Sequence, residues 1–169
     1  MKSLAHASVI RWGGVCLAGG ALAFLGAIAM MLGLMRWPSI HWRLAGAFAG
    51  ATAAEQAMLA TMFDGLNTYL GNFIGEFLGE LAVSVFFLLT SFPWLRSSQR
   101  ARWIGWIGMV TAIAGLVGMF RNVTTVVAPV AAVNNYLLPL FMIILGVALI
   151  RWRDSDVAAP ERMATGHSL

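Results

Sequence analysis

The ten residues GNFIGEFLGE, numbered 71–80, decide the fold class of this chain. They open an apolar run, 70–92, that is long enough to cross a bilayer as a single helix. At about 100° per residue, residues four positions apart form stripes along a helix. One stripe is Gly71, Gly75 and Gly79, and a second stripe, about 100° away, is Asn72, Glu76 and Glu80.

The two stripes predict different surroundings. Glycines let a neighbouring helix backbone approach closely, so we expect a packing surface along the first stripe. A carboxylate at the centre of a membrane helix costs about 3 kcal/mol, so Glu76 and Glu80 must face protein or water. Gly105 and Gly108, in a later apolar run, are also expected to be helix-packing residues.

The composition indicates a helical membrane protein. Of the 169 residues, 60% are hydrophobic and 11% are charged, which lies outside the soluble globular range. The net charge of +4 comes from basic residues at the ends of apolar runs, so nucleic acid is not an expected partner. The single cysteine, Cys16, excludes an internal disulfide and a cysteine metal site.

Five apolar segments predict an all-α bundle of five transmembrane helices in one domain, 1–153, followed by a flexible cytoplasmic tail, 154–169. The second segment carries Glu55, and the alternative is a bundle of four spans in which this segment is a non-spanning helix. We favour five because Glu55 shares its side with large apolar residues, so the segment lacks the polar face of a surface helix. The predicted spans are 13–35, 44–63, 70–92, 103–120 and 133–150.

Lysine and arginine positions orient both topologies in the same way. With either number of spans, eight of the 11 basic residues are cytoplasmic and the rest are outside. The 93–102 loop and the C-terminus are therefore predicted to be cytoplasmic, at the inner membrane of the cell. The N-terminus is outside with five spans and cytoplasmic with four.

Polar residues gather at the outer ends of the last three predicted helices. A lone Arg121 near carboxylates is expected to form an ion pair, with Glu76 as its first partner. With five spans, Glu55 would share one internal cavity with Glu76 and Glu80. The candidate intramembrane polar pocket is Glu55, Asn72, Glu76, Glu80, Arg121, Asn122, Asn134, Asn135 and Tyr136.

The residues needed for several kinds of chemistry are missing from the sequence. His6, His41 and His167 fall outside the predicted spans, so a bis-histidine haem would lack its ligands. The H-E-x-x-H zinc motif is absent, and Ser84 has no histidine within a span to activate it. We therefore predict no catalytic residue, no metal and no cofactor, and a protein that is not an enzyme.

Three motifs, at 70–80, 102–108 and 135–151, resemble a large family of uncharacterised bacterial multi-pass membrane proteins, catalogued as a domain of unknown function. The resemblance covers roughly residues 64–151. It implies an all-helical fold in a bacterial inner membrane, and it carries no functional residue over to this chain.

These observations predict a small integral membrane protein that acts as an accessory, assembly or regulatory subunit. One alternative is a proton- or ion-coupled carrier of a small molecule that uses the intramembrane glutamates. Another is a lipid- or quinone-binding subunit of a larger complex. The expected partners are the lipid bilayer and either a second copy of the chain or a larger membrane complex.

Overall fold

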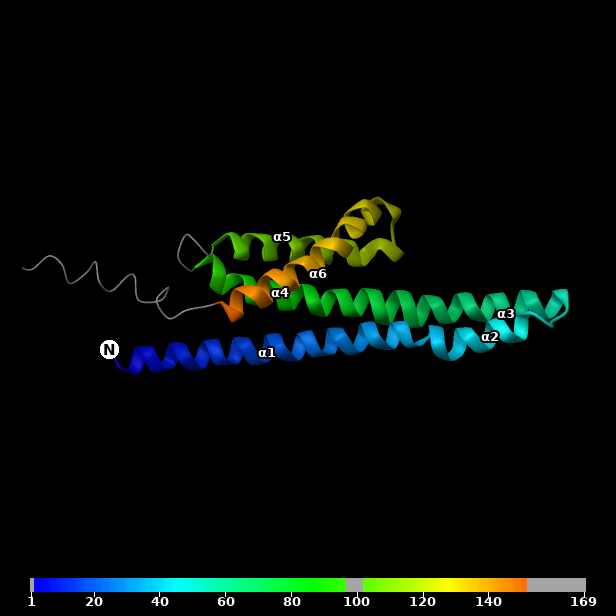
Figure 1. The fold of residues 1–169 in the computed structure, drawn as a ribbon, viewed down its shortest axis with the longest axis horizontal. Coiled ribbons are helices and arrows are strands. Elements are labelled where there is room, and N and C mark those ends of the chain that lie inside the picture. The colour runs from blue at the N-terminus through cyan, green and yellow to red at the C-terminus, as the bar shows by residue number, and fades with distance from the viewer. Residues whose placement is uncertain (1, 97–101, 152–169) are drawn as a thin grey trace, which may run out of the picture.

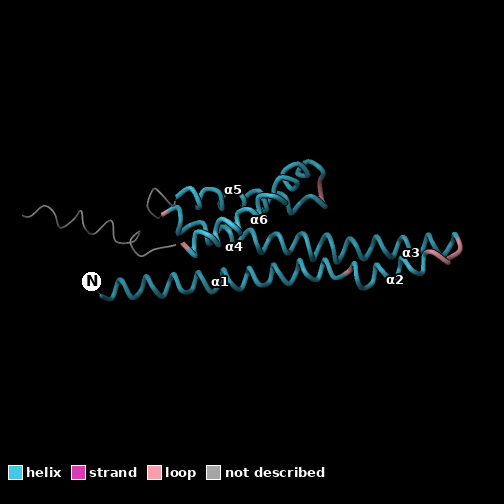
Figure 2. Tube along the Cα trace, viewed as in Figure 1, coloured by secondary structure: helices cyan, strands magenta, loops and turns pink. Residues whose placement is uncertain are grey.

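A computed structural model of the protein describes residues 2–96 and 102–151, with side chains from residue 13 onwards (Figure 1). Within this part of the chain the regular secondary structure is helical, and no strand is present (Figure 2). The coarse prediction of an all-α fold is therefore confirmed. The predicted tail, 154–169, lies outside the described residues.

The N-terminal half is a long antiparallel helical hairpin, whose two arms run side by side for most of the length of the molecule (Figure 1). Each arm contains a π-helical segment, in which the backbone bonds reach five residues along the chain instead of four. The first arm consists of α1 (Lys2–Met35), the π-helix η1 (Trp37–His41) and α2 (Trp42–Phe48). The second arm consists of α3 (Ala53–Leu66), the π-helix η2 (Asn67–Leu78) and α4 (Gly79–Leu95).

The C-terminal half is a shorter pair of helices that packs on one end of the hairpin. α5 packs against α4, and α6 packs against α5, so the far end of the hairpin projects beyond them (Figure 1). The elements of this pair are α5 (Arg102–Gly118), the 3₁₀-helix η3 (Met119–Asn122), the 3₁₀-helix η4 (Thr125–Val127) and α6 (Ala128–Ile150).

Four helical stretches among the described residues are long and apolar enough to cross a membrane. The first two have 36 and 43 residues, about twice the 20 or so that cross the hydrocarbon core. The last two, with 21 and 26 residues, match that length. These stretches are Gly13–Phe48, Ala53–Leu95, Arg102–Asn122 and Thr125–Ile150.

The predicted count of five spans is not confirmed, because residues 44–63 include the end of the first arm and the start of the second, joined by a chain reversal at 49–52. Thr52 is extended, with ψ of 163°, and is the N-cap of α3. Oε2 of Glu55 accepts hydrogen bonds from the Thr52 backbone nitrogen at 2.8 Å and from Thr52 Oγ1 at 2.7 Å. This is a capping box, a Thr followed three residues later by Glu, and that sequence signal was overlooked.

Glycines set the distance between the two arms of the hairpin. A β-carbon added to Gly33 of α1 would lie 2.6 Å from Cα of Gly75, closer than real β-carbons approach. One added to Gly79 would lie 2.7 Å from Cγ of Met30. In the C-terminal half, Gly105 packs on the backbone of Leu95 and Gly108 packs on the Phe141 ring. The glycines of the sequence motif therefore lie where neighbouring elements come closest.

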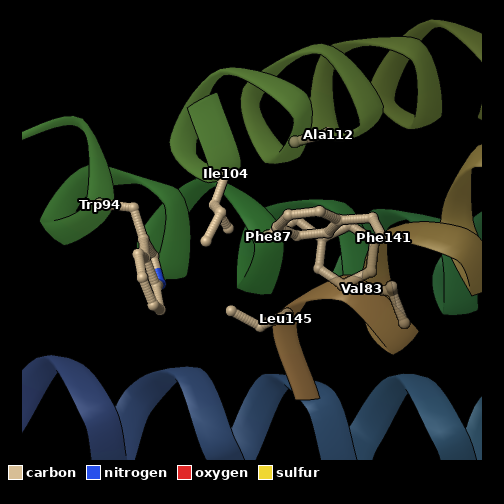
Figure 3. Close-up of a cluster of buried hydrophobic side chains, with 7 residues drawn as sticks. All are labelled: Val83, Phe87, Trp94, Ile104, Ala112, Phe141 and Leu145. Carbon is tan, nitrogen blue, oxygen red and sulfur yellow. The ribbon is translucent and has the colours of Figure 1, made fainter. Parts of the chain in front are cut away.

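A hydrophobic core joins α4, α5 and α6 (Figure 3). Phe87 of α4 and Phe141 of α6 are fully buried and meet edge to face, with ring centroids 4.8 Å apart. The aromatic pair lies at the middle of α4 and α6, between the polar end of the bundle, described next, and the end where α4 ends and α5 begins. The core residues are Val83, Phe87, Trp94, Ile104, Ala112, Phe141 and Leu145.

Candidate functional site

A cluster of polar side chains lies where η2, α4, η3 and α6 meet, at the end of the C-terminal pair that faces the projecting part of the hairpin. The chain brings these residues together because α5 returns η3 to the start of α4, and α6 begins beside it. We call this group the polar cluster. Its members are Glu76, Glu80, Arg121, Asn122, Asn134 and Asn135.

Glu80, in the first turn of α4, is the centre of the polar cluster, and the residue is only 2% exposed. Its Oε2 accepts a hydrogen bond from Nη2 of Arg121, and the two groups form an ion pair. Its Oε1 accepts a 2.8 Å hydrogen bond from Nδ2 of Asn134. A buried ion pair is tolerated only when further hydrogen bonds satisfy the remaining lone pairs, and Asn134 supplies one here.

Glu76 lies one turn earlier and is more open, with 40% of its side chain exposed. Its Oε2 accepts a 2.9 Å hydrogen bond from Nδ2 of Asn122 and lies 3.6 Å from Nε of Arg121. The predicted pair of Glu76 with Arg121 is therefore present. Arg121 nevertheless makes its closer contact with Glu80.

One guanidinium connects three elements. Arg121 extends from η3 to both glutamates, and its Nη1 donates a 3.2 Å hydrogen bond to Oδ1 of Asn135 on α6. Gly118, at the end of α5, lets α6 come close to η3, because a β-carbon at this position would lie 3.1 Å from Cα of Ala131 on α6. The cluster thus holds together the ends of segments that are far apart in the sequence.

Two residues of the predicted pocket lie elsewhere. Glu55 is exposed at the far end of the hairpin, because residues 44–63 reverse direction instead of crossing the bundle. Tyr136 is 79% exposed, since it lies two positions, or about 200°, from the buried Asn134 around α6. Asn72 contributes its backbone carbonyl, which lies 3.5 Å from Nδ2 of Asn122.

Sequence reasoning overlooked Arg36, which follows α1 and lies beside the cluster. Its Nε donates a 3.0 Å hydrogen bond to Oδ1 of Asn67, and its Nη1 donates to the carbonyl of Gly33. Its guanidinium rests on Gly71, where an added β-carbon would lie 2.6 Å from Cζ. The sequence holds no local signal for this contact, because it depends on the register between the two arms of the hairpin.

The packing of His41, which lies outside the predicted spans, was not predicted either. It is 2% exposed, and its ring stacks on Phe63 with centroids 4.0 Å apart, while Trp37 meets it edge-on at 5.0 Å. Neither ring nitrogen has a hydrogen-bond partner among the described residues. The histidine therefore joins the two arms by ring packing alone.

A cavity of about 310 Å³ adjoins the polar cluster, between α1, η2 and α6. Two arginines and two glutamates line it, so their formal charges balance. Both carboxylates already contact Arg121, which leaves neither of them an unpaired general base. The charged and polar lining residues are Arg36, Glu76, Glu80, Arg121 and Asn135.

Comparison with known proteins supplies no functional assignment. No protein-family model, no curated protein and no solved structure matches the chain. The family resemblance of residues 64–151 therefore stays a prediction.

Proposed function

We propose that this chain is a four-span protein of a bacterial inner membrane that acts as an accessory, assembly or regulatory subunit. Both termini and the 97–101 loop are cytoplasmic in this proposal, and the 49–52 turn is outside. The positive-inside tendency supports the orientation, since only Arg36, Arg43 and Arg121 of the 11 basic residues would then be outside.

The observation that carries the proposal is the length of the hairpin. Its second arm, Ala53–Leu95, has 43 residues, which corresponds to roughly 60 Å of helix, against a hydrocarbon core of about 30 Å. If α5 and α6 lie in the bilayer, residues 36–66 extend beyond it. We call these residues the hairpin tip.

The hairpin tip is too apolar for a surface that faces only water. Trp42 is 76% exposed and Met58 is 65% exposed, and Phe48 and Met62 are exposed as well. Arg43, Glu55 and Asp64 are its only charged residues beyond Arg36. Large exposed apolar surfaces mark interaction sites, so we infer that the tip binds an apolar, helical surface of another membrane protein.

The carrier alternative receives less support from the geometry. A carrier needs a polar path that continues from Glu80 towards the cytoplasmic end, and the buried Phe87 and Phe141 rings occupy that direction. Both oxygens of Glu80 are already engaged, by Arg121 and by Asn134. We therefore assign the polar cluster a structural role, in which it holds α4, α6 and η3 in register below the tip.

Photo-crosslinking in living cells tests the proposal. A photoreactive phenylalanine analogue is placed at Met58 in the hairpin tip or, as a control, at Ile113, which is 52% exposed on α5. We expect a discrete protein adduct from position 58. The control position should yield only lipid adducts or none, because it would face the bilayer.

Three other outcomes would overturn the proposal. Absence of any protein adduct at position 58 would contradict a tip that binds a partner. Equal protein adducts at positions 58 and 113 would contradict specificity for the tip. An adduct of twice the chain mass would identify a second copy as the partner and would replace the accessory role with self-association.

A further inference from the structure

A second cavity, distinct from the polar cluster, opens at the opposite end of the helix bundle. It is an apolar groove of about 490 Å³ lined by α1, α4 and α6. The groove exists because α1 packs on α4 while α6 packs on α5, which leaves space between α1 and α6. Small residues widen it, since a β-carbon added to Gly20 of α1 would meet nothing within 4 Å. The helix walls include Cys16, Gly20, Phe86, Trp94, Leu145 and Leu149.

The groove ends near two arginines. Trp94 and Leu149 line the groove, and Arg96 and Arg151, both exposed, are the C-cap residues of the same two helices. Acidic residues are absent from the described helical segments around this end. These segments are 13–35, 82–96, 102–118 and 139–151.

The dimensions of the groove suit a lipid chain. From Phe86 to Trp94 the α4 wall rises by eight residue steps, or about 12 Å, close to the roughly 15 Å of one leaflet of the hydrocarbon core. The volume of about 490 Å³ lies within the usual range of small-ligand pockets, about 300–1,000 Å³, and suits a single acyl chain.

We propose that the groove binds one acyl chain of an anionic phospholipid from the cytoplasmic leaflet, with the lipid phosphate between Arg96 and Arg151. A phosphate satisfies both guanidiniums, and the apolar walls replace the lipid surroundings of the chain. A zwitterionic lipid would bring an additional positive charge to the two arginines. The inference rests on the membrane placement proposed above, and it is independent of any partner at the hairpin tip.

Cys16 makes the proposal testable without an engineered probe, because it is the only cysteine of the chain and it lines the groove. The full-length protein is reconstituted in nanodiscs of phosphatidylcholine, with or without phosphatidylglycerol, and alkylation of Cys16 by a membrane-permeant maleimide is timed. We expect phosphatidylglycerol to slow the reaction. In Arg96→Gln and Arg151→Gln, the phosphatidylglycerol concentration for half-maximal protection should rise roughly fivefold per arginine.

The matched control is Arg102→Gln, which removes the same charge from the same side of the membrane without touching the groove lining. It should leave protection unchanged. Equal protection of Cys16 in the two lipids would overturn a specific site between Arg96 and Arg151. So would a loss of protection in Arg102→Gln as large as in Arg96→Gln and Arg151→Gln. Oxidative crosslinking of Cys16 between two copies in the nanodisc would overturn the lipid as occupant. Because wild-type protein alone distinguishes the two lipids, a poorly folding variant does not remove the test.

Discussion

Nδ2 of Asn134 on α6 donates a 2.8 Å hydrogen bond to Oε1 of Glu80 on α4, at a position where both residues are almost wholly buried. Since α5 packs against both of these helices, the bond is a polar connection across the bundle. Arg121 occupies the other oxygen of the same carboxylate. The Glu80 carboxylate therefore connects α4, α6 and η3, and its removal should lower the stability of the protein.

The first prediction concerns Glu80→Gln. The substitution keeps the size of the side chain but leaves Arg121 without its buried counter-charge, and breaking a buried pair in this way costs about 3–5 kcal/mol. We expect the free energy of unfolding in detergent, measured by denaturant titration, to fall by an amount in this range.

Glu76→Gln is the matched control for that measurement. Its side chain is 40% exposed, and a glutamine can still accept the hydrogen bond from Asn122. We expect a loss below about 1 kcal/mol, the usual range for exposed pairs. Equal losses in the two variants would show that Glu80 is not the centre of the cluster.

Much of the local pattern could be predicted from sequence. In the stretch 71–80, the glycines were expected to meet a neighbouring helix, and the carboxylates were expected to meet Arg121. Both kinds of contact are present: Gly75 packs on Gly33 of α1, and Arg121 forms ion pairs with Glu76 and with Glu80. Such contacts follow from residue type and helical spacing, so they need no knowledge of the rest of the fold.

The features that were missed have different causes. Alanine and glycine around 44–63 suit a packed helix and a reversing hairpin equally well, and only the local capping box of Thr52 and Glu55 marks the reversal. Arg36 reaches Asn67 only because the two arms pair in one register. Tyr136 is next to Asn135 in sequence, yet the helical rotation turns it to the exposed surface of α6.

The second prediction concerns Gly33→Ala. The added β-carbon would lie 2.6 Å from Cα of Gly75, and a backbone atom cannot move aside as a flexible side chain can. The arms must separate locally, and we expect a loss of about 1–3 kcal/mol in the free energy of unfolding. Gly14→Ala on the same helix meets nothing within 4 Å and should be neutral or slightly stabilising. Equal effects of the two substitutions would rule out the close approach.

The third prediction concerns the side of the N-terminus. α1 starts at the end of the molecule where α4 ends and α5 begins, so the N-terminal end should lie on the same side of the membrane as the end of α4 (Figure 1). A green fluorescent protein fused before Met1 should fluoresce, and alkaline phosphatase fused there should be inactive, as expected in the cytoplasm. The opposite pair of results would support five spans and would place Glu55 back within the bundle.

The fourth prediction uses Thr52→Ala to distinguish a turn from a continuous helix. Thr52 caps α3 through its contacts with Glu55, and replacing a threonine N-cap by alanine costs about 1 kcal/mol. Hydrogen exchange should therefore accelerate in the first turn of α3, at residues 53–56, while exchange in α5 stays unchanged. In an uninterrupted helix over 44–63 the same substitution would replace a β-branched residue by the best helix former, and exchange would slow instead. The sign of the change thus decides whether the chain reverses at 49–52.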